Sequence, residues 1–407
     1  MKYRPDLLDE KSPGNIKVAQ LTTEKDVPSS HIYMEAQVFS ADSRRFLLHR
    51  AAHAHGSDHN DPKHQYLVCD LENHCTLSPL TNEIGATAPS VFGEKLVYYF
   101  VDQTEVGGGR LTLKRVNPDG TDRQTIMVID SAIPETNYRP SRIYPLSTIS
   151  PDGKRLALSC FLGDGRLESV NWGLMVFDLE KPAVQLILQG PSWCNVHPQY
   201  CRSADASAGH DILVQENHGN ITGAHGQNKR VTGGNGADIH VIRDDGTNFR
   251  DMPWGRDGNE FCQGHQCWRG RNVWAITGTQ TKQPQEAQLI EGRAGPAADH
   301  IGIKTPGGAR NDLSRNFPRP DFHHFGTDMD GKRLITDNCL TSGGKLFIAD
   351  LGEPGRDPAE FAYLMSPRSS CSKQAHIHPF LSPNGKFGFF NSDESGISQA
   401  YMITWDG

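Results

Sequence analysis

Residues 149–160 read ISPDGKRLALSC, in which an Asp-Gly turn precedes a run that alternates apolar residues with others. Such a turn ahead of an alternating run is a strong hairpin signal. The same arrangement occurs at seven places, about 50 to 65 residues apart. The seven stretches are FSADSRRFLLHR (39–50), VFGEKLVYYF (91–100), ISPDGKRLALSC (149–160), CRSADASAGHDILVQEN (201–217), CWRGRNVWAITG (267–278), TDMDGKRLITDN (327–338) and LSPNGKFGFFNS (381–392).

Each turn and strand is followed by a further apolar run that can pair with it. These runs are QYLVCDL (65–71), RLTLKRV (110–116), GLMVFDL (173–179), DIHVIRD (238–244), AQLIE (287–291), KLFIADL (345–351) and QAYMITW (399–405). Helical periodicity is almost absent. Seven such units predict an all-β, seven-bladed β-propeller with blades of about four antiparallel strands. The alternative is an irregular two-sheet β protein, but a sandwich rarely repeats so evenly.

The two ends of the chain are expected to meet in the last blade. Residues 1–14 are expected to form an N-terminal extension, and residues 15–407 a single propeller. A propeller closes when a strand from one end of the chain completes the blade at the other end. The segment IKVAQLTT (16–23) precedes the first unit. It is therefore predicted to be the outer strand of the last blade.

Composition narrows the class of protein. The 407 residues carry a formal net charge of −7, with 22% charged and 36% hydrophobic residues, as in ordinary soluble domains. Without a basic patch we expect no nucleic-acid partner, and without a long apolar run we expect no membrane span. The nine cysteines form no CxxC pair. The N-terminus has no signal-like apolar region, so a cytoplasmic location is expected.

The stretches just before the seven turns are unusually polar. In a propeller these form the innermost strands and line the central channel. Here they carry His, Gln, Arg and Tyr where core strands would carry Val, Ile or Leu. They are HIYMEAQV (31–38), SRIYPLST (141–148), NVHPQYCR (195–202), GHQCW (264–268), DFHHFGT (321–327) and QAHIHPFL (374–381). This pattern predicts a functional site in the channel.

A metal site is the first candidate. Gln374, His376 and His378 form Q-x-H-x-H on one predicted strand, and the period of two would put them on one face. Neutral imidazole and amide oxygen suit Mn²⁺, Fe²⁺ or Zn²⁺ better than Ca²⁺, which is still not excluded. His323 and His324 lie on the equivalent strand of the preceding unit. The alternative is a set of hydrogen-bonded channel histidines that bind no metal.

These residues resemble the oligogalacturonate lyase family. The resemblance is carried by His324, seven residues before Gly331 of an Asp-Gly turn, and by Q-x-H-x-H before a proline. It implies a seven-bladed propeller that holds Mn²⁺ through three histidines and one glutamine. The ligands implied here are His324, Gln374, His376 and His378, with His323 as a neighbour. The activity implied is metal-dependent cleavage of short uronic-acid oligosaccharides by β-elimination, as in pectin degradation.

Other stretches match the family in the same order. KVAQLTT with His31 and Tyr33 resembles its start, and NVHPQY (195–200), ENHG (216–219) and DDGTNFR (244–250) resemble its fourth blade. CQGHQCW (262–268) resembles the stretch with the proposed catalytic histidine, which falls on His265. The family's arginine position holds Asp238 here, within a segment expanded by residues 220–236. Arg230, Lys229 or Arg142 could supply the charge instead.

The resemblance assigns a consistent set of roles. His265 would remove the C5 proton, a metal would neutralise the C6 carboxylate, and Arg230 or Arg142 would clamp that carboxylate. Substrate contacts are expected from His197, Tyr144, His31 and His218, with His197 and Tyr144 also candidates for leaving-group protonation. Alternatives are a lyase of the same fold that acts on glucuronate or rhamnose–glucuronate units, and a non-catalytic propeller scaffold.

One further histidine-rich segment resembles a metal tract. It contains His49, His53, His55, His59 and His64. Because it lies in a Gly-, Asp- and Asn-rich hairpin, a solvated loop is the favoured interpretation.

Overall fold

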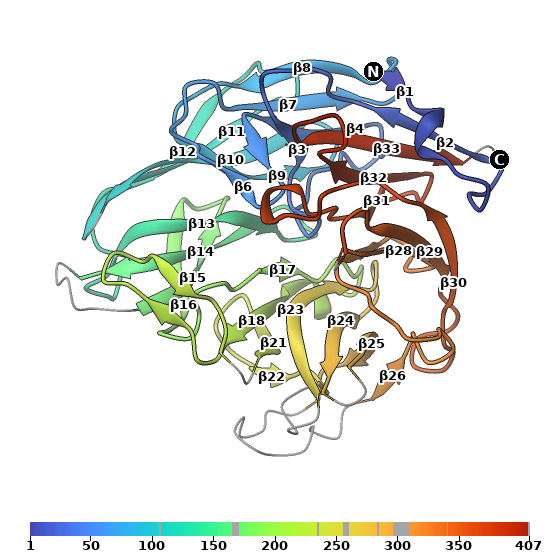
Figure 1. Cartoon of the computed structure of the whole chain (residues 1–407). Coiled ribbons are helices and arrows are strands. Elements are labelled where there is room, and N and C mark those ends of the chain that lie inside the picture. The colour runs from blue at the N-terminus through green and yellow to red at the C-terminus, as the bar shows by residue number, and fades with distance from the viewer. Residues whose placement is uncertain are drawn as a thin grey trace.

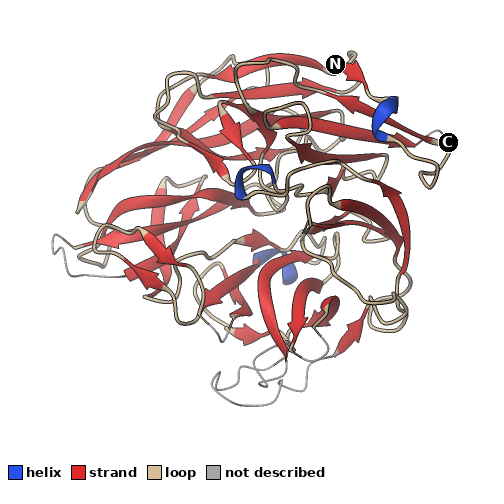
Figure 2. Ribbon diagram, in the orientation of Figure 1, coloured by secondary structure: helices blue, strands red, loops and turns tan. Residues whose placement is uncertain are grey.

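Small antiparallel sheets arranged in a ring make up the chain (Figure 1). The computed structural model describes residues 1–407 except 106, 165–170, 234–235, 255–259, 283–284, 296–308, 340 and 406–407. Among the described residues helices are limited to three short 3-10 turns, and strands dominate (Figure 2). The 3-10 helices are η1 (Pro5–Leu7), η2 (Ala208–His210) and η3 (Lys373–Ala375). This arrangement confirms the predicted all-β propeller.

Most of the described strands fall into units of four in chain order, and the last unit has five because β1 and β2 from the start of the chain join it. The first three units are β3 (Ser29–His31), β4 (Arg45–Arg50), β7 (Gln65–Asp70) and β8 (Thr76–Thr81); β9 (Ala86–Phe92), β10 (Leu96–Glu105), β11 (Gly108–Val116) and β12 (Gln124–Ile129); and β13 (Arg139–Ile149), β14 (Arg155–Gly163), β15 (Asn171–Asp178) and β16 (Ala183–Gly190).

The next two units share an eight-stranded sheet that a single residue pair, Ala237↔Cys262, joins in the middle. They are β17 (Gln199–Tyr200), β18 (Asp211–Asn217), β21 (Ala237–Arg243) and β22 (Arg250–Asp251), then β23 (Glu260–Trp268), β24 (Trp274–Thr281), β25 (Ala287–Arg293) and β26 (Arg310–Asp312). The last two are β27 (Phe325–Thr327), β28 (Arg333–Asn338), β29 (Lys345–Asp350) and β30 (Glu360–Met365), and β31 (Phe380–Leu381), β32 (Phe387–Ser392) and β33 (Gln399–Trp405) with β2 (Ile16–Gln20) and β1 (Lys2–Tyr3). Two small hairpins, β5 (Ala52–His53) with β6 (Gly56–Ser57) and β19 (Ile221–Thr222) with β20 (Asn228–Arg230), lie outside these units.

Three of the recurring turns share one hydrogen-bonding scheme. In the third unit the Ser150 hydroxyl donates to the Asp152 carboxylate at 2.6 Å, and the backbone N–H of Arg155 donates back to Ser150 at 3.0 Å. The first and last units repeat this scheme with Ser40 and Asp42, and with Ser382 and Asn384. Side-chain hydrogen bonds of this kind fix a turn without help from distant residues. The turns were therefore readable from sequence.

The hydrophobic core lies between neighbouring sheets. Between the second and third units, Leu113 of β11 and Phe100 of β10 belong to one buried cluster with Leu156 and Leu158 of β14. Burial of each such side chain contributes about 1.5–3 kcal/mol to the stability of the fold. The polar inner strands are left to face the axis. Inner strands of successive units touch one another, as β9 touches β13 and β27 touches β31.

The chain ends meet in the last unit. β2 pairs antiparallel with β33, with Val18 opposite Ile403, and β1 adds a further strand outside β2. Residues 2–3 of the expected extension thus take part in the sheet. Arg4 is buried between β2 and the loop after β32, where it forms ion pairs with Glu394 and Asp6.

The inner stretches depart from the expected strands. β17, β27 and β31 are only two or three residues long, and the residues before them are irregular. The prediction of one strand over residues 374–381 was wrong, because η3 covers Lys373–Ala375 and the strand starts at Phe380. His378 has φ of 46° and precedes Pro379, which lacks an N–H for a sheet ladder. No helix in the described part of the chain is long and apolar enough to cross a bilayer.

Candidate metal centre

Six histidines gather where the inner ends of three blades meet the β5–β6 hairpin. This histidine cluster consists of His55, His265, His323, His324, His376 and His378. His324 lies in the middle. Its ring centroid is 4.2 Å from that of His378, 4.5 Å from that of His265 and 5.1 Å from that of His376. The sequence prediction that His324, His376 and His378 converge is met by this geometry, although no single strand carries the last two.

The ring orientations of His324 and His378 are set by their Nδ1 atoms. His324 Nδ1 lies 3.0 Å from Oδ2 of the buried Asp337, which also accepts the His324 backbone N–H at 2.9 Å. His378 Nδ1 donates to the Ala54 carbonyl at 3.1 Å. A proton on Nδ1 leaves the Nε2 lone pair free. Both Nε2 atoms are buried without a hydrogen-bond partner among the described residues.

The cluster is electrically neutral at neutral pH. Burial, together with neighbouring imidazoles, lowers the pKa of His265, His324 and His378 well below the usual value. Burial also lowers the pKa of His323 to about 4. A neutral imidazole can bind a metal through its unprotonated nitrogen. A buried nitrogen that lacks a hydrogen-bond partner destabilises the folded protein. The two unpaired Nε2 atoms and the carboxylate behind His324 fit a divalent transition metal.

His55 completes the cluster from the solvent side. Its Nε2 lies 2.9 Å from His376 Nδ1, and its ring lies 4.8 Å from that of His378. Ala54 anchors the segment, because its N–H donates to the Gln374 carbonyl while its own carbonyl accepts from His378. The interpretation of residues 49–64 as a solvated loop was wrong for His49 and His64, which are 4% and 3% exposed. His55 is exposed, as that interpretation expected, but it also contacts the cluster.

The remaining metal-ligand prediction, Gln374, falls on an exposed residue in η3. Its role as the fourth ligand stays a prediction.

A second polar group adjoins the histidine cluster. Tyr144 Oη lies 2.9 Å from His197 Nε2, and His197 Nδ1 lies 2.7 Å from Oε2 of Glu35. Tyr33 bridges the two groups, with its ring 5.2 Å from that of His197 and 4.7 Å from that of His378. Glu35 was missed in the sequence, because a lone acid in a polar stretch has no distinguishing pattern.

Local irregularities aim these side chains. The pairing of β23 with β24 shifts between Cys262 and Gln266, so His265 lies in a bulge. The pairing of β13 with β14 shifts between Ile143 and Ser147, which places Tyr144 in a second bulge. Bulges re-aim side chains next to active sites. His197, like His378, has a positive φ, here 48°, and precedes a proline. Such strained backbone is typical of functional sites.

The other predicted site residues lie apart from these two groups or inside packing. Arg142 is exposed on β13, and Arg230 is exposed on β20, where its Nε donates to the Gly219 carbonyl. His31 is 1% exposed, and its ring packs against Phe380 and Phe389. His31 therefore supports the core, which corrects its prediction as a substrate contact.

His218 lies against carboxylates. Its Nε2 is 3.1 Å from Asp238 and 3.5 Å from Glu216. The position at which the resemblance implied an arginine is thus part of an acidic group in this chain.

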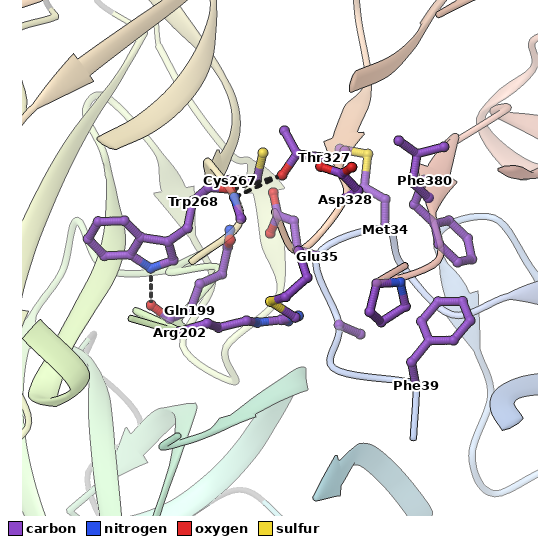
Figure 3. Close-up of a pocket in the computed structure, with 16 residues that line it drawn as sticks. Met34, Glu35, Phe39, Gln199, Arg202, Cys267, Trp268, Thr327, Asp328 and Phe380 are labelled. Atoms are coloured by element: carbon purple, nitrogen blue, oxygen red, sulfur yellow. Dashed lines mark hydrogen bonds between the residues drawn. The ribbon is translucent and has the colours of Figure 1, made fainter. Parts of the chain in front are cut away.

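An axial pocket adjoins Glu35 (Figure 3). It has a volume of about 80 Å³ and is lined by Glu35, Gln199, Arg202, Trp268 and Asp328 among others. Arg202 is a cation that sequence analysis missed. Burial lowers the pKa of its guanidinium to about 10.

A larger groove starts at His323. It has a volume of about 1040 Å³ and is lined by Gln263, Gln280, Gln285, Phe261, Arg319 and Asp321 among others. We call it the glutamine groove. Its walls come from the segment between β20 and β21, from β23, from the β24–β25 connection and from the segment before β27.

Comparison with solved structures gives likenesses over nearly the whole chain. An oligogalacturonate lyase in complex with manganese is 18% identical, with a TM-score of 0.69 over 100% of this chain and 97% of that one. An oligogalacturonate lyase from Vibrio parahaemolyticus is 16% identical, with a TM-score of 0.66 over 97% and 95%. The β-propeller domain of a Myceliophteria thermophila protein is 12% identical, with a TM-score of 0.50 over 94% and 99%.

No family model and no curated protein sequence matches the chain. At such low identities the likenesses show that the chain shares the propeller fold of these proteins, as the sequence resemblance predicted. The activity and substrate of those proteins are not assigned to this chain by the shared fold alone.

Proposed function

We propose that this protein is a metal-dependent lyase that cleaves short uronic-acid oligosaccharides by β-elimination. The observation that carries the proposal is the histidine cluster with two buried, unpaired Nε2 atoms. A propeller that served only as an interaction scaffold would need no such ligand set on its axis. The likeness to two oligogalacturonate lyases supports the same reading. A role late in pectin breakdown inside the cell belongs to this proposal.

The residues that would hold the metal are His324, His376 and His378, with Gln374 as a fourth ligand. Mn²⁺ is the metal proposed, and Fe²⁺ or Zn²⁺ also suits imidazole donors. A bound divalent cation supplies positive charge beside the C6 carboxylate, where negative charge builds up after the C5 proton leaves. Asp337 would hold His324 in the tautomer that exposes Nε2.

His265 is the proposed base. It is neutral at working pH because burial lowers its pKa, so its lone pair can accept the C5 proton. Its ring lies 4.5 Å from that of His324, beside the proposed metal ligands. The bulge in β23 turns it toward the cluster rather than into the sheet.

Of the two arginines proposed as the carboxylate clamp, Arg142 is the better placed. It is exposed on the inner strand β13, two residues before Tyr144. Arg230 lies on the β19–β20 hairpin and is tied to Gly219. His197 and Tyr144 are proposed to contact the substrate, and His218 to contact a sugar farther along.

The glutamine groove is the proposed seat of the oligosaccharide. Amide side chains offer both donors and acceptors to sugar hydroxyls, and Phe261 offers a flat apolar face. Among the described residues that line the groove, Arg319 is the one arginine or lysine, whereas Asp321 and Glu286 are acids. A groove with so little positive charge, and with Asp238 in place of an arginine, favours a second candidate substrate that carries fewer negative charges. This substrate is a uronate joined to an uncharged sugar, such as rhamnose–glucuronate.

The test is a panel of uronate oligosaccharides, followed by the ultraviolet absorbance of the new C4–C5 double bond. Activity should vanish with a chelator and return with Mn²⁺. His265→Ala should keep its metal and lose turnover by roughly 10²-fold or more, as expected for a lost general base. Activity that persists in chelator, or His265→Ala turnover near wild type, would contradict the proposal. Loss of metal in that variant would make His265 a ligand instead.

A further inference from the structure

A hydrogen-bonded chain of three side chains leads away from the histidine cluster. It runs from Tyr144 to His197 at 2.9 Å and from His197 to Glu35 at 2.7 Å. The three residues come from three different blades: Tyr144 from β13, His197 from the segment before β17, and Glu35 from the segment after β3. His197 and Glu35 side chains are 5% and 3% exposed, whereas Tyr144 keeps part of its surface open. A buried chain with one open end is suited to proton transfer.

We infer that Tyr144 donates the proton to the leaving oxygen on C4, and that His197 and Glu35 position Tyr144 and replace its proton. This inference rests on the proposed function. It makes Tyr144 a catalytic residue, and His197 and Glu35 positioning residues.

The location of Tyr144 suits a second proton-transfer group. The proposed base, His265, contacts His324 on one side of the cluster. Tyr33 contacts His378 on the other side and leads to His197 and Tyr144. An elimination removes a proton from C5 and an oxygen from C4, and the oxygen leaves more readily when a second group protonates it. His265 belongs to the cluster, and Tyr144 adjoins it through Tyr33 and His197.

The protonation state of Tyr144 also suits a donor. Burial and the nearby Glu35 charge raise its pKa well above 10, so the phenol keeps its proton at neutral pH. Tyr144 is poorly suited to act as the base, because a phenol with so high a pKa is almost never ionised. An acid of this kind donates only when a strongly basic oxygen develops beside it, as happens when the C4–O bond breaks.

The proton count balances over the step. His265 takes the C5 proton, and the electron pair of that C–H bond forms the C4–C5 double bond. The C4–O bond breaks with its pair on oxygen, which takes the Tyr144 proton. In this step His197 starts with a proton on each ring nitrogen, Nδ1–H toward the Glu35 carboxylate and Nε2–H toward Tyr144. The Tyr144 oxygen then takes the Nε2 proton, and His197 stays hydrogen-bonded to Glu35 through Nδ1–H. His265 has gained one proton and His197 has lost one, and solvent restores both.

Solvent protons can return through the Glu35 end of this hydrogen-bonded chain. Glu35 lines the axial pocket, whose volume of about 80 Å³ has room for several water molecules (Figure 3). Within the described part of the protein, Glu35 Oε1 is buried without a hydrogen-bond partner. Water in this pocket can therefore reach the carboxylate from the side opposite the histidine cluster.

The test compares two substrates and one exchange reaction in Tyr144→Phe. On an oligouronide the variant should lose turnover by roughly 10²-fold or more, the usual scale for a lost general acid. On a uronide with a nitrophenyl ether at C4 it should stay near wild type, because that leaving group needs no proton. Exchange of the C5 proton in heavy water, followed by NMR, should continue.

Two further variants separate function from structure. Glu35→Gln should show the same pattern more weakly, with unchanged metal content. Tyr200→Phe is the matched control, because Tyr200 is another tyrosine with a hydrogen-bonded hydroxyl, which donates to Asp244, but it lies outside the site. This variant should behave as wild type throughout.

The outcomes are distinct. Full oligouronide turnover in Tyr144→Phe would overturn this inference alone. Equal loss on both substrates and in exchange would assign Tyr144 to the base or to structure, and would also overturn it. If the wild-type protein eliminates no uronide, the proposed function fails and this inference fails with it.

Discussion

Asp337→Asn should weaken metal binding while leaving the fold intact. In the wild-type protein the carboxylate accepts both the ring Nδ1–H and the backbone N–H of His324. Asparagine has the same shape, and its oxygen can keep the backbone hydrogen bond. Its NH₂ group then takes the place of Oδ2, 3.0 Å from Nδ1. Two donors face each other there, so His324 is driven to the tautomer with its proton on Nε2, the atom proposed to bind metal.

The size of the effect follows from that tautomer change. Losing a carboxylate partner behind a metal-binding histidine typically costs 10- to 100-fold in affinity, which is about 1.4–2.7 kcal/mol. Burial raises the pKa of Asp337 well above its usual range, so the charge is costly in the metal-free protein. The metal-free variant should therefore resist urea at least as well as wild type, and loss of metal cannot then be ascribed to unfolding.

The assay is a competition titration of Mn²⁺ between the protein and a fluorescent chelator at neutral pH. Asp244→Asn is the matched control, because Asp244 Oδ2 lies 2.9 Å from His210 Nδ1 in a similar pair outside the histidine cluster. Its metal affinity should equal that of wild type. The reasoning is refuted if Asp337→Asn binds Mn²⁺ as tightly as wild type, or if both variants weaken binding equally.

Three further outcomes test the fold. Deleting residues 1–23 removes the partner of β33 and should produce aggregation, seen by light scattering, because an unpaired strand edge is exposed; full solubility would contradict closure by β2. Arg269→Ala leaves the fully buried Glu291 uncompensated and should cost about 3–5 kcal/mol in urea unfolding, against about 1 kcal/mol or less for Lys154→Ala at an exposed pair. Glu216 has its pKa lowered to about 2 from 4.5, so its stabilisation is present above pH 4.5 and is lost as the pH falls toward 2. Glu216→Gln should flatten the pH dependence of stability in that window. An unchanged profile would show that Glu216 does not cause this pH dependence.

The second and third strands of each unit were predictable because their causes are local. In three turns the hydroxyls of Ser40, Ser150 and Ser382 donate to an Asp or Asn two residues on, and these bonds fix the turn within a few residues. Alternating apolar residues then place one face of each strand between sheets. All seven predicted third strands, from residues 65–71 to 399–405, occur as strands in the structure.

The channel was only partly predictable because its causes are distant. The period of two assigned to Gln374, His376 and His378 failed, since η3 and the positive φ of His378 break the strand. His55 was missed because its role depends on Ala54 docking against a segment more than three hundred residues away. Asp337 and Glu35 were missed because each is a single acid whose importance lies in which histidine it meets.

The contact between His55 and His376 joins residues 321 positions apart. On the ribosome, the β5–β6 hairpin and β2 emerge early, while their partners, the His376 segment and β33, emerge last. Until translation ends, β2 is an unpaired edge and the proposed metal centre lacks three of its four proposed ligands, Gln374, His376 and His378. Metal can therefore be captured in its full site only after the whole ring has been made, so a truncated nascent chain should carry neither a complete cofactor site nor a sealed last blade.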